Sequence, residues 1–169
     1  KQTNYSGAIE LLSQREPLAG KLADEYIFWL GEAQLQKGDF KSAAETFARL
    51  VSKFPASARC LQAAISEASA RARMDEWQQI IKSLQQSEGP FQAAVRSGAT
   101  NDLVVRGFLL LSDAQFHEKD YDGAEKTVGM LSRFSLNPEL AWQSQYLLSR
   151  ILSGGGRVED ALRNSTNLS

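Results

Sequence analysis

Residues 27–34 read Ile27-Phe28-Trp29-Leu30-Gly31-Glu32-Ala33-Gln34, and the turn Gly38-Asp39-Phe40 follows them. The apolar residues of this stretch recur at steps of three and four, which is the spacing of one face of an amphipathic helix. Gly31 has no side chain, so a second helix can pack close to the first at this point. Gly38 can adopt the left-handed conformation that ends a helix, and Asp39 can cap the next helix.

A second helix is therefore predicted after this turn, with its apolar face marked by Ala43-x3-Phe47. Phe54-Pro55 ends it, because proline disfavours a helical conformation in the residue before it. Together the two helices resemble one unit of the tetratricopeptide repeat, a helix–turn–helix of about 34 residues with the pattern Trp-x2-Leu-Gly-x2-Tyr, Ala-x3-Phe and Pro. Ile27 stands where the family has Trp, and Gln34 stands where it has Tyr. The alternative is an ordinary helical hairpin in a bundle.

The pattern recurs along the chain. Turn aromatic residues or their substitutes occur at Tyr5, Phe40, Trp77, Tyr121 and Val158. Three of the four separations lie near the period of a helical-hairpin solenoid, about 34 residues. Small residues recur at the Gly31 position, where the sequence suggests Ser69, Ser112 and Ser149, but the turn of the second unit then differs in length from the others by one residue. The fourth unit is the weakest, because three glycines replace its tight turn.

We therefore predict an all-α chain that forms a right-handed solenoid of antiparallel helix pairs, similar to tetratricopeptide repeats and without a sheet. The expected division is a partial repeat at 1–17, repeats at about 22–55, 58–88, 102–137 and 139–169, and an insertion at about 89–101. The chain opens with what resembles the second half of a repeat, so we expect it to be a piece of a longer protein.

The insertion accounts for the one long interval between turn aromatics. Gly89-Pro90 and Ser97-Gly98 are pairs that break helices, and the residues between them could form one or two helical turns. The insertion is either a longer connection that lets the stack bend or a loop on a binding edge. The first alternative is the simpler one.

Composition narrows the possible functions. Nineteen Lys and Arg residues against 20 Asp and Glu give a net charge of −1, whereas a protein built to bind nucleic acid is usually basic. One cysteine, Cys60, excludes a disulfide within the chain and a cysteine metal cluster, and we expect it to be a core residue. No apolar run reaches the length of a membrane span, so we expect no direct membrane insertion.

Catalytic chemistry is sparse. His117 is the one histidine, and Asp113 lies four residues before it, which is the geometry of a base and the group that orients it. The alternative is a solvated pair on a helix surface, which is far more common. No nucleophile or phosphate-binding motif is present. We therefore expect no enzyme activity, no cofactor and no metal.

The resemblance implies that the first helix of each unit lines a concave groove. The predicted groove residues are Glu25, Trp29, Glu32, Gln36, Arg106, Asp113, His117, Gln143 and Arg150. Trp29 is either an exposed anchor or a residue packed between repeats. The opposite charges of Glu32 and Arg150 would give the groove an electrical polarity. The Lys and Asn residues with which chaperone-binding members clamp a terminal carboxylate are not at the matching positions.

The function expected from the resemblance is a non-enzymatic scaffold that binds a peptide or a helix of a partner protein in its groove. The alternative is a structural or oligomerisation module that associates with itself. A weaker resemblance, Phe54-Pro55-x-Ser57, points to bacterial cell-envelope assembly proteins that carry these repeats. It favours a periplasmic or cell-envelope location slightly over a cytoplasmic one.

Overall fold

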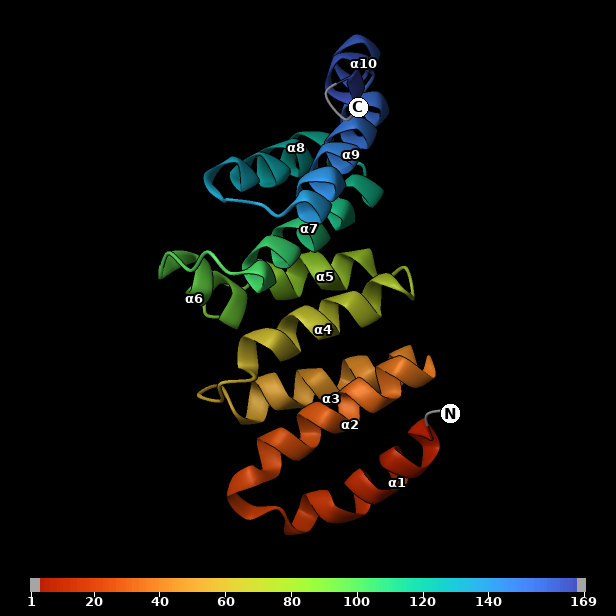
Figure 1. The fold of residues 1–169 in the computed structure, drawn as a ribbon, viewed down its shortest axis with the longest axis vertical. Coiled ribbons are helices and arrows are strands. Elements are labelled where there is room, and N and C mark those ends of the chain that lie inside the picture. The colour runs from red at the N-terminus through yellow and green to blue at the C-terminus, as the bar shows by residue number, and fades with distance from the viewer. Residues whose placement is uncertain (1–3, 167–169) are drawn as a thin grey trace.

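The computed structural model describes residues 4–166, with side chains through Asn164, and all regular secondary structure in this part of the chain is helical (Figure 1). The α-helices are α1 (Tyr5–Arg15), α2 (Ala23–Lys37), α3 (Phe40–Lys53), α4 (Cys60–Ala72), α5 (Trp77–Leu84), α6 (Pro90–Arg96), α7 (Asp102–His117), α8 (Tyr121–Gly129), α9 (Pro138–Gly154) and α10 (Val158–Thr166). Short 3-10 turns lie at Glu16–Leu18, Gly20–Leu22 and Met130–Arg133.

The helices form a stack that follows chain order along its long axis, from α1 at one end to α10 at the other (Figure 1). The pairs α2–α3, α4–α5, α7–α8 and α9–α10 each pack together, and every pair also contacts the next. Each unit thus touches its neighbours in sequence, as a solenoid requires. The predicted all-α fold of stacked helix pairs is confirmed. The repeat bounds stay a prediction. The first residues of the partial repeat at 1–17 and the last residues of the repeat at 139–169 lie outside the described residues.

The first hairpin forms as its sequence predicts. Gly38 is left-handed, with φ +86°, and the Asp39 side chain accepts a hydrogen bond of 3.2 Å from the backbone N–H of Ser42. Helix α3 then ends at Lys53, directly before Phe54-Pro55. Glycine at residue 38 favours this turn because the left-handed backbone conformation is strained for residues with a Cβ atom.

The same turn closes the other three hairpins of the described chain. The left-handed residues are Gly38, Asp75, Lys119 and Gly156, each two positions before the turn aromatic or its substitute. Each of these residues and the one after it donate backbone hydrogen bonds of 2.8–3.3 Å to the last turn of the preceding helix, in the pattern of a Schellman motif. Measured from the left-handed residue to the start of the next helix, the second and fourth turns therefore have the same length as the first, contrary to the sequence expectation.

Equal turns correct the register of the second unit. Counting back from the turn, Ala68 rather than Ser69 corresponds to Gly31, and it is fully buried. Ser112 at the third such position is also fully buried, and its hydroxyl donates a hydrogen bond of 2.7 Å to the carbonyl of Ala124 in α8. At the fourth, the Asn164 side chain in α10 donates a bond of 2.8 Å to Ser149. Small side chains thus join the two helices of a pair at a fixed position.

Gly31 shows why that position must be small. A Cβ atom added there would lie 2.7 Å from Cε1 of Phe47, which is fully buried in α3. The predicted close approach of the two helices at Gly31 is therefore confirmed.

The insertion is part of the core rather than a plain connection. Phe91 of α6 is 1% exposed and packs edge-on against Phe108 of α7, with ring centroids 5.2 Å apart. A Cβ atom at Gly107 would collide with the Phe91 ring. The Gln92 side chain donates a hydrogen bond of 2.7 Å to the carbonyl of Leu84, which ties α6 to the end of α5. The sequence predicted the helical turns but not this burial.

Two glycine substitutions test this packing. We expect Gly31→Ala and Gly107→Ala each to lower the free energy of unfolding by about 1–3 kcal/mol, because the added methyl group overpacks a buried aromatic ring. Gly129→Ala is the matched control, since a Cβ atom added there would meet nothing within 4 Å and the helical backbone at this residue tolerates alanine. It should be neutral or stabilise by up to about 1 kcal/mol. Chemical denaturation followed by circular dichroism measures all three, and equal effects would contradict the packing described.

Candidate functional site

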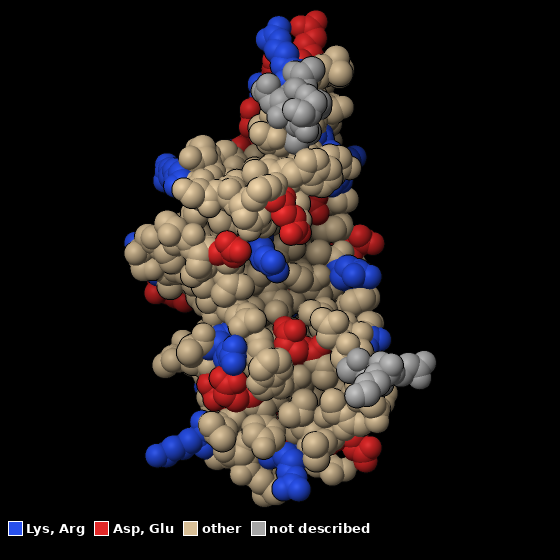
Figure 2. Space-filling model, in the orientation of Figure 1, with Lys and Arg blue, Asp and Glu red and all other residues tan. Residues whose placement is uncertain are grey.

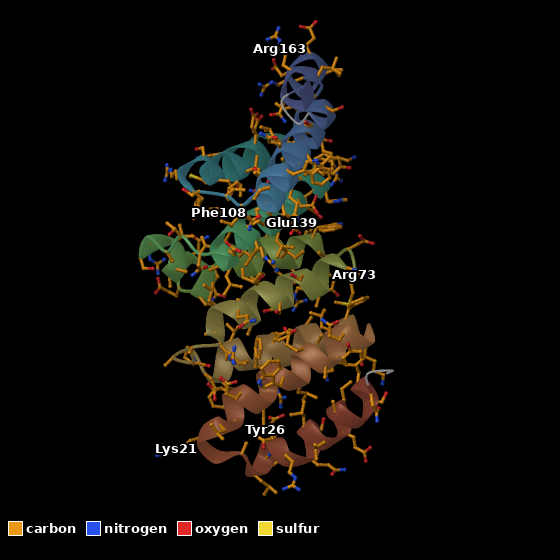
Figure 3. The ribbon with its side chains drawn as sticks, in the orientation of Figure 1. Lys21, Tyr26, Arg73, Phe108, Glu139 and Arg163 are labelled. Atoms are coloured by element: carbon orange, nitrogen blue, oxygen red, sulfur yellow. The ribbon has the colours of Figure 1, made fainter. Side chains whose placement is uncertain are left out.

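The exposed sides of α2, α4, α7 and α9 form a surface that we call the first-helix face. These helices contact one another in the order α2–α4, α4–α7 and α7–α9, so the face is continuous along the stack. Figure 3 labels Tyr26 in α2 and Glu139 in α9, the first and last of these four helices. On the side of the molecule seen in Figure 2, acidic and basic residues are interspersed rather than gathered in a patch of one sign. All nine predicted groove residues lie on these helices.

The acidic residues of α2 already have partners in the next unit. Arg59 donates a hydrogen bond of 2.9 Å to Glu25, and Ser66 donates one of 3.1 Å to Glu32. Ser57 donates one of 2.6 Å to Asp24. The bond to Glu25 is the main cause that raises the pKa of Arg59. These contacts tie α2 to the start of the next pair, so Glu25 and Glu32 have a structural role whatever else they bind.

Asp113, His117 and Arg150 come together at the junction of α7 and α9. Arg150 Nη1 lies 3.2 Å from Asp113 Oδ1, and its guanidinium covers the Phe116 ring at 4.6 Å. His117 stacks on Trp77, with ring centroids 4.0 Å apart and planes 6° from parallel. Its Nε2 lies 3.8 Å from Asp113 Oδ1, which is too long for an orienting hydrogen bond. The geometry therefore favours the surface-pair interpretation over a catalytic base.

The remaining predicted residues line shallow hollows. Arg106 and Gln143 share one with Ser69 and Leu140, and Gln36 lines another with Ser69 and Arg73. Ser69 thus joins two hollows on the first-helix face. Glu25 and Trp29 line a third, between α1 and α2. The structure consequently distributes the predicted residues over several hollows and does not gather them in one deep cleft.

Trp29 is held on one side and open on the other. Its ring meets Phe28 edge-on at 5.4 Å, the Arg59 guanidinium lies 5.6 Å from it, and 51% of the residue is exposed. Phe28, by contrast, is 1% exposed and belongs to the core. Trp29 is therefore partly packed against Phe28 and Arg59 and partly exposed.

Sequence reasoning missed an aromatic pair at the other end of the face. Trp142 and Tyr146 of α9 stack 5.3 Å apart with planes 3° from parallel, and they are 53% and 48% exposed. Their spacing of four residues on a helix was the signal that could have found the pair. The Arg150 guanidinium lies 5.9 Å from the Tyr146 ring, so an aromatic and cationic stripe runs along α9.

Other chemistry is limited in the described residues. Cys60 is buried as predicted, and burial raises the pKa of its thiol, which lowers its reactivity. In the part of the chain that the structure describes, no group of three or more His, Cys, Asp or Glu side chains is placed to hold a metal ion. No helix in that part of the chain is both long enough and apolar enough to cross a membrane.

Comparison with known proteins gives one match. A model of the tetratricopeptide repeat matches residues 25–57, which comprise most of α2, the turn and α3. Comparisons with curated proteins and with solved structures gave no significant match. The matched segment is about a fifth of the chain, and it supports a repeat of this kind but not the suggested cell-envelope location. The match supports one tetratricopeptide repeat at these residues, in the hairpin with the strongest sequence pattern, and such a repeat suggests a protein-interaction module.

Proposed function

We propose that the chain is a non-enzymatic scaffold whose first-helix face binds a peptide or a helix of a partner protein. The observation that carries this proposal is the placement of half-exposed aromatic rings on that face, Trp29 at one end and the pair Trp142 and Tyr146 at the other. Tryptophan and tyrosine are enriched among the residues that dominate binding energies at protein interfaces. The tetratricopeptide match at residues 25–57 supports the same class of function.

Aromatic contacts rather than charge should supply most of the affinity. Glu25, Glu32 and Asp113 already accept hydrogen bonds from neighbouring units, and Arg150 is paired with Asp113. The expected polarity between Glu32 and Arg150 is therefore weakened by contacts within the chain. Among the predicted groove residues, Arg106 is the arginine that forms no ion pair with another described residue.

The free energy of unfolding can distinguish the paired Arg150 from the unpaired Arg106. Arg150→Gln should lower the free energy of unfolding by up to about 1 kcal/mol in low salt, and by less in about 1 M salt, because a partly exposed ion pair is screened. Arg106→Gln is the matched control on the same face and should change it little. The measurement is urea denaturation at two salt concentrations. Equal effects of the two substitutions would show that the Asp113–Arg150 pair does not hold α9 on α7.

Binding can be tested with peptides selected from a displayed library of random peptides, each about four helical turns long, against the intact chain. We expect Trp29→Ala or Tyr146→Ala to weaken the selected peptides about thirtyfold, since removing an interface aromatic commonly costs about 2 kcal/mol. Leu162→Ala, an exposed apolar residue of α10, is the control and should not weaken them. Fluorescence anisotropy gives the affinities, and melting curves check the fold of each variant.

The proposal fails if the selected peptides respond to Leu162→Ala and to neither aromatic substitution. A fall in melting temperature for Trp29→Ala without loss of affinity would assign Trp29 to packing between units. We propose no cofactor, no nucleic-acid ligand and no membrane insertion. The cell-envelope location stays a prediction.

Self-association is the second candidate function, and exposed apolar residues at both ends of the stack favour it. Leu18 and Leu22 are 80% and 59% exposed near α1, and Val158 and Leu162 are 54% and 63% exposed in α10. Burying such groups between copies would be favourable. Light scattering against protein concentration, with Leu22→Ser and Leu162→Ser as variants, distinguishes this function: a monomer at all concentrations excludes it.

A further inference from the structure

A pocket lies where the insertion meets the third helix pair, away from the nine predicted groove residues. Its volume is about 580 Å³, and its wall includes Val95, Phe108, Gln115, Lys126, Arg133 and Phe134. Helices α6 and α8 extend to the same side of the stack, and Phe108 of α7 lies between them (Figures 1 and 3). The insertion supplies one side of this pocket, so the extra residues between Trp77 and Tyr121 help to form it.

The floor of the pocket is apolar and aromatic. Phe108 and Phe134 meet edge-on, with ring centroids 5.9 Å apart, and Val95 and Met130 line the same space. Polar side chains line the same space, and two of them, Gln92 and Gln115, are held by hydrogen bonds. Gln115 is 5% exposed, and its side-chain oxygen accepts a hydrogen bond of 2.7 Å from Thr127. An apolar floor with a few placed polar groups, at a volume between about 300 and 1,000 Å³, is typical of small-molecule sites.

The charges of the pocket are of one sign. Lys126 and Arg133 both line it, both are exposed, and neither forms an ion pair with a described residue. The lining contains no Asp or Glu among the described residues. Elsewhere in the structure arginines are commonly paired with carboxylates, as Arg49 is with Glu16 and Arg157 with Glu125. The two cations at this pocket are therefore available to an anion from outside the chain.

We propose that the pocket binds a small organic acid with an apolar body, such as a medium-chain or aromatic carboxylate. The apolar body would cover Phe108 and Phe134, and the carboxylate would lie at the mouth between Lys126 and Arg133. Such a ligand removes apolar surface from water and gives both cations a partner, so each part of the pocket has a complementary group. This site is independent of peptide binding on the first-helix face.

The direct test is calorimetric titration of the intact chain with decanoate, and with decanol as the uncharged analogue of the same length. We expect decanoate to bind at least tenfold more tightly than decanol. Lys126→Gln and Arg133→Gln should each weaken decanoate about fivefold, the upper range for one exposed charge pair, and leave decanol unchanged. Lys41→Gln, an exposed lysine of α3 outside the pocket, is the matched control and should change neither.

A space-filling variant completes the test. Val95→Trp should abolish decanoate binding by occupying the floor, with circular dichroism used to confirm that the helices persist. The proposal is overturned if decanoate does not saturate the chain at millimolar concentration, or if it binds no better than decanol. It is also overturned if the double charge substitution leaves its affinity unchanged, because the acid then binds elsewhere. Selection of peptides that lose affinity in Val95→Trp, without decanoate binding, would assign the pocket to a protein partner instead.

Discussion

The stack depends on how closely the two helices of each pair can approach. In the first pair, Gly31 leaves room for the buried ring of Phe47. The same position holds Ala68 and Ser112 in the second and third pairs, and the position of Phe47 holds Leu84 and Val128. The residue on one helix thus becomes smaller as the residue on the other becomes larger. This exchange of volume keeps a close-packed junction in sequences that otherwise have little in common.

Much of this fold can be predicted from the sequence, but the turns limit the prediction. Gly38 indicates a left-handed residue, whereas Asp75 and Lys119 adopt the same conformation at φ +57° and +64° without such a signal. Two backbone hydrogen bonds in each turn help to hold them in that strained region. The sequence therefore placed the second unit one residue out of register. Nor could it show that Phe91 enters the core, since that contact depends on Gly107 in a later helix.

The candidate site is less predictable because its contacts join different units. Sequence spacing places Glu25, Glu32 and Asp113 on exposed helix sides. Their partners Arg59, Ser66 and Arg150 lie 34–37 residues further along the chain, in the next unit. These contacts, which connect one unit to the next, are visible in the folded structure and not in the sequence. Trp29, Trp142 and Tyr146 remain about half exposed on the face, where the proposed partner would contact them.

A double-mutant cycle on Gly31→Ala and Phe47→Leu measures whether a Cβ atom at residue 31 interacts with the ring of Phe47. If the added methyl group clashes with the ring, Phe47→Leu should relieve part of that cost, and the two changes together should cost less than the sum of each alone. We predict a coupling of about 1 kcal/mol or more in the free energy of unfolding, within the range for residues in contact. Additive effects, within about 0.3 kcal/mol, would show that residues 31 and 47 are not packed against each other.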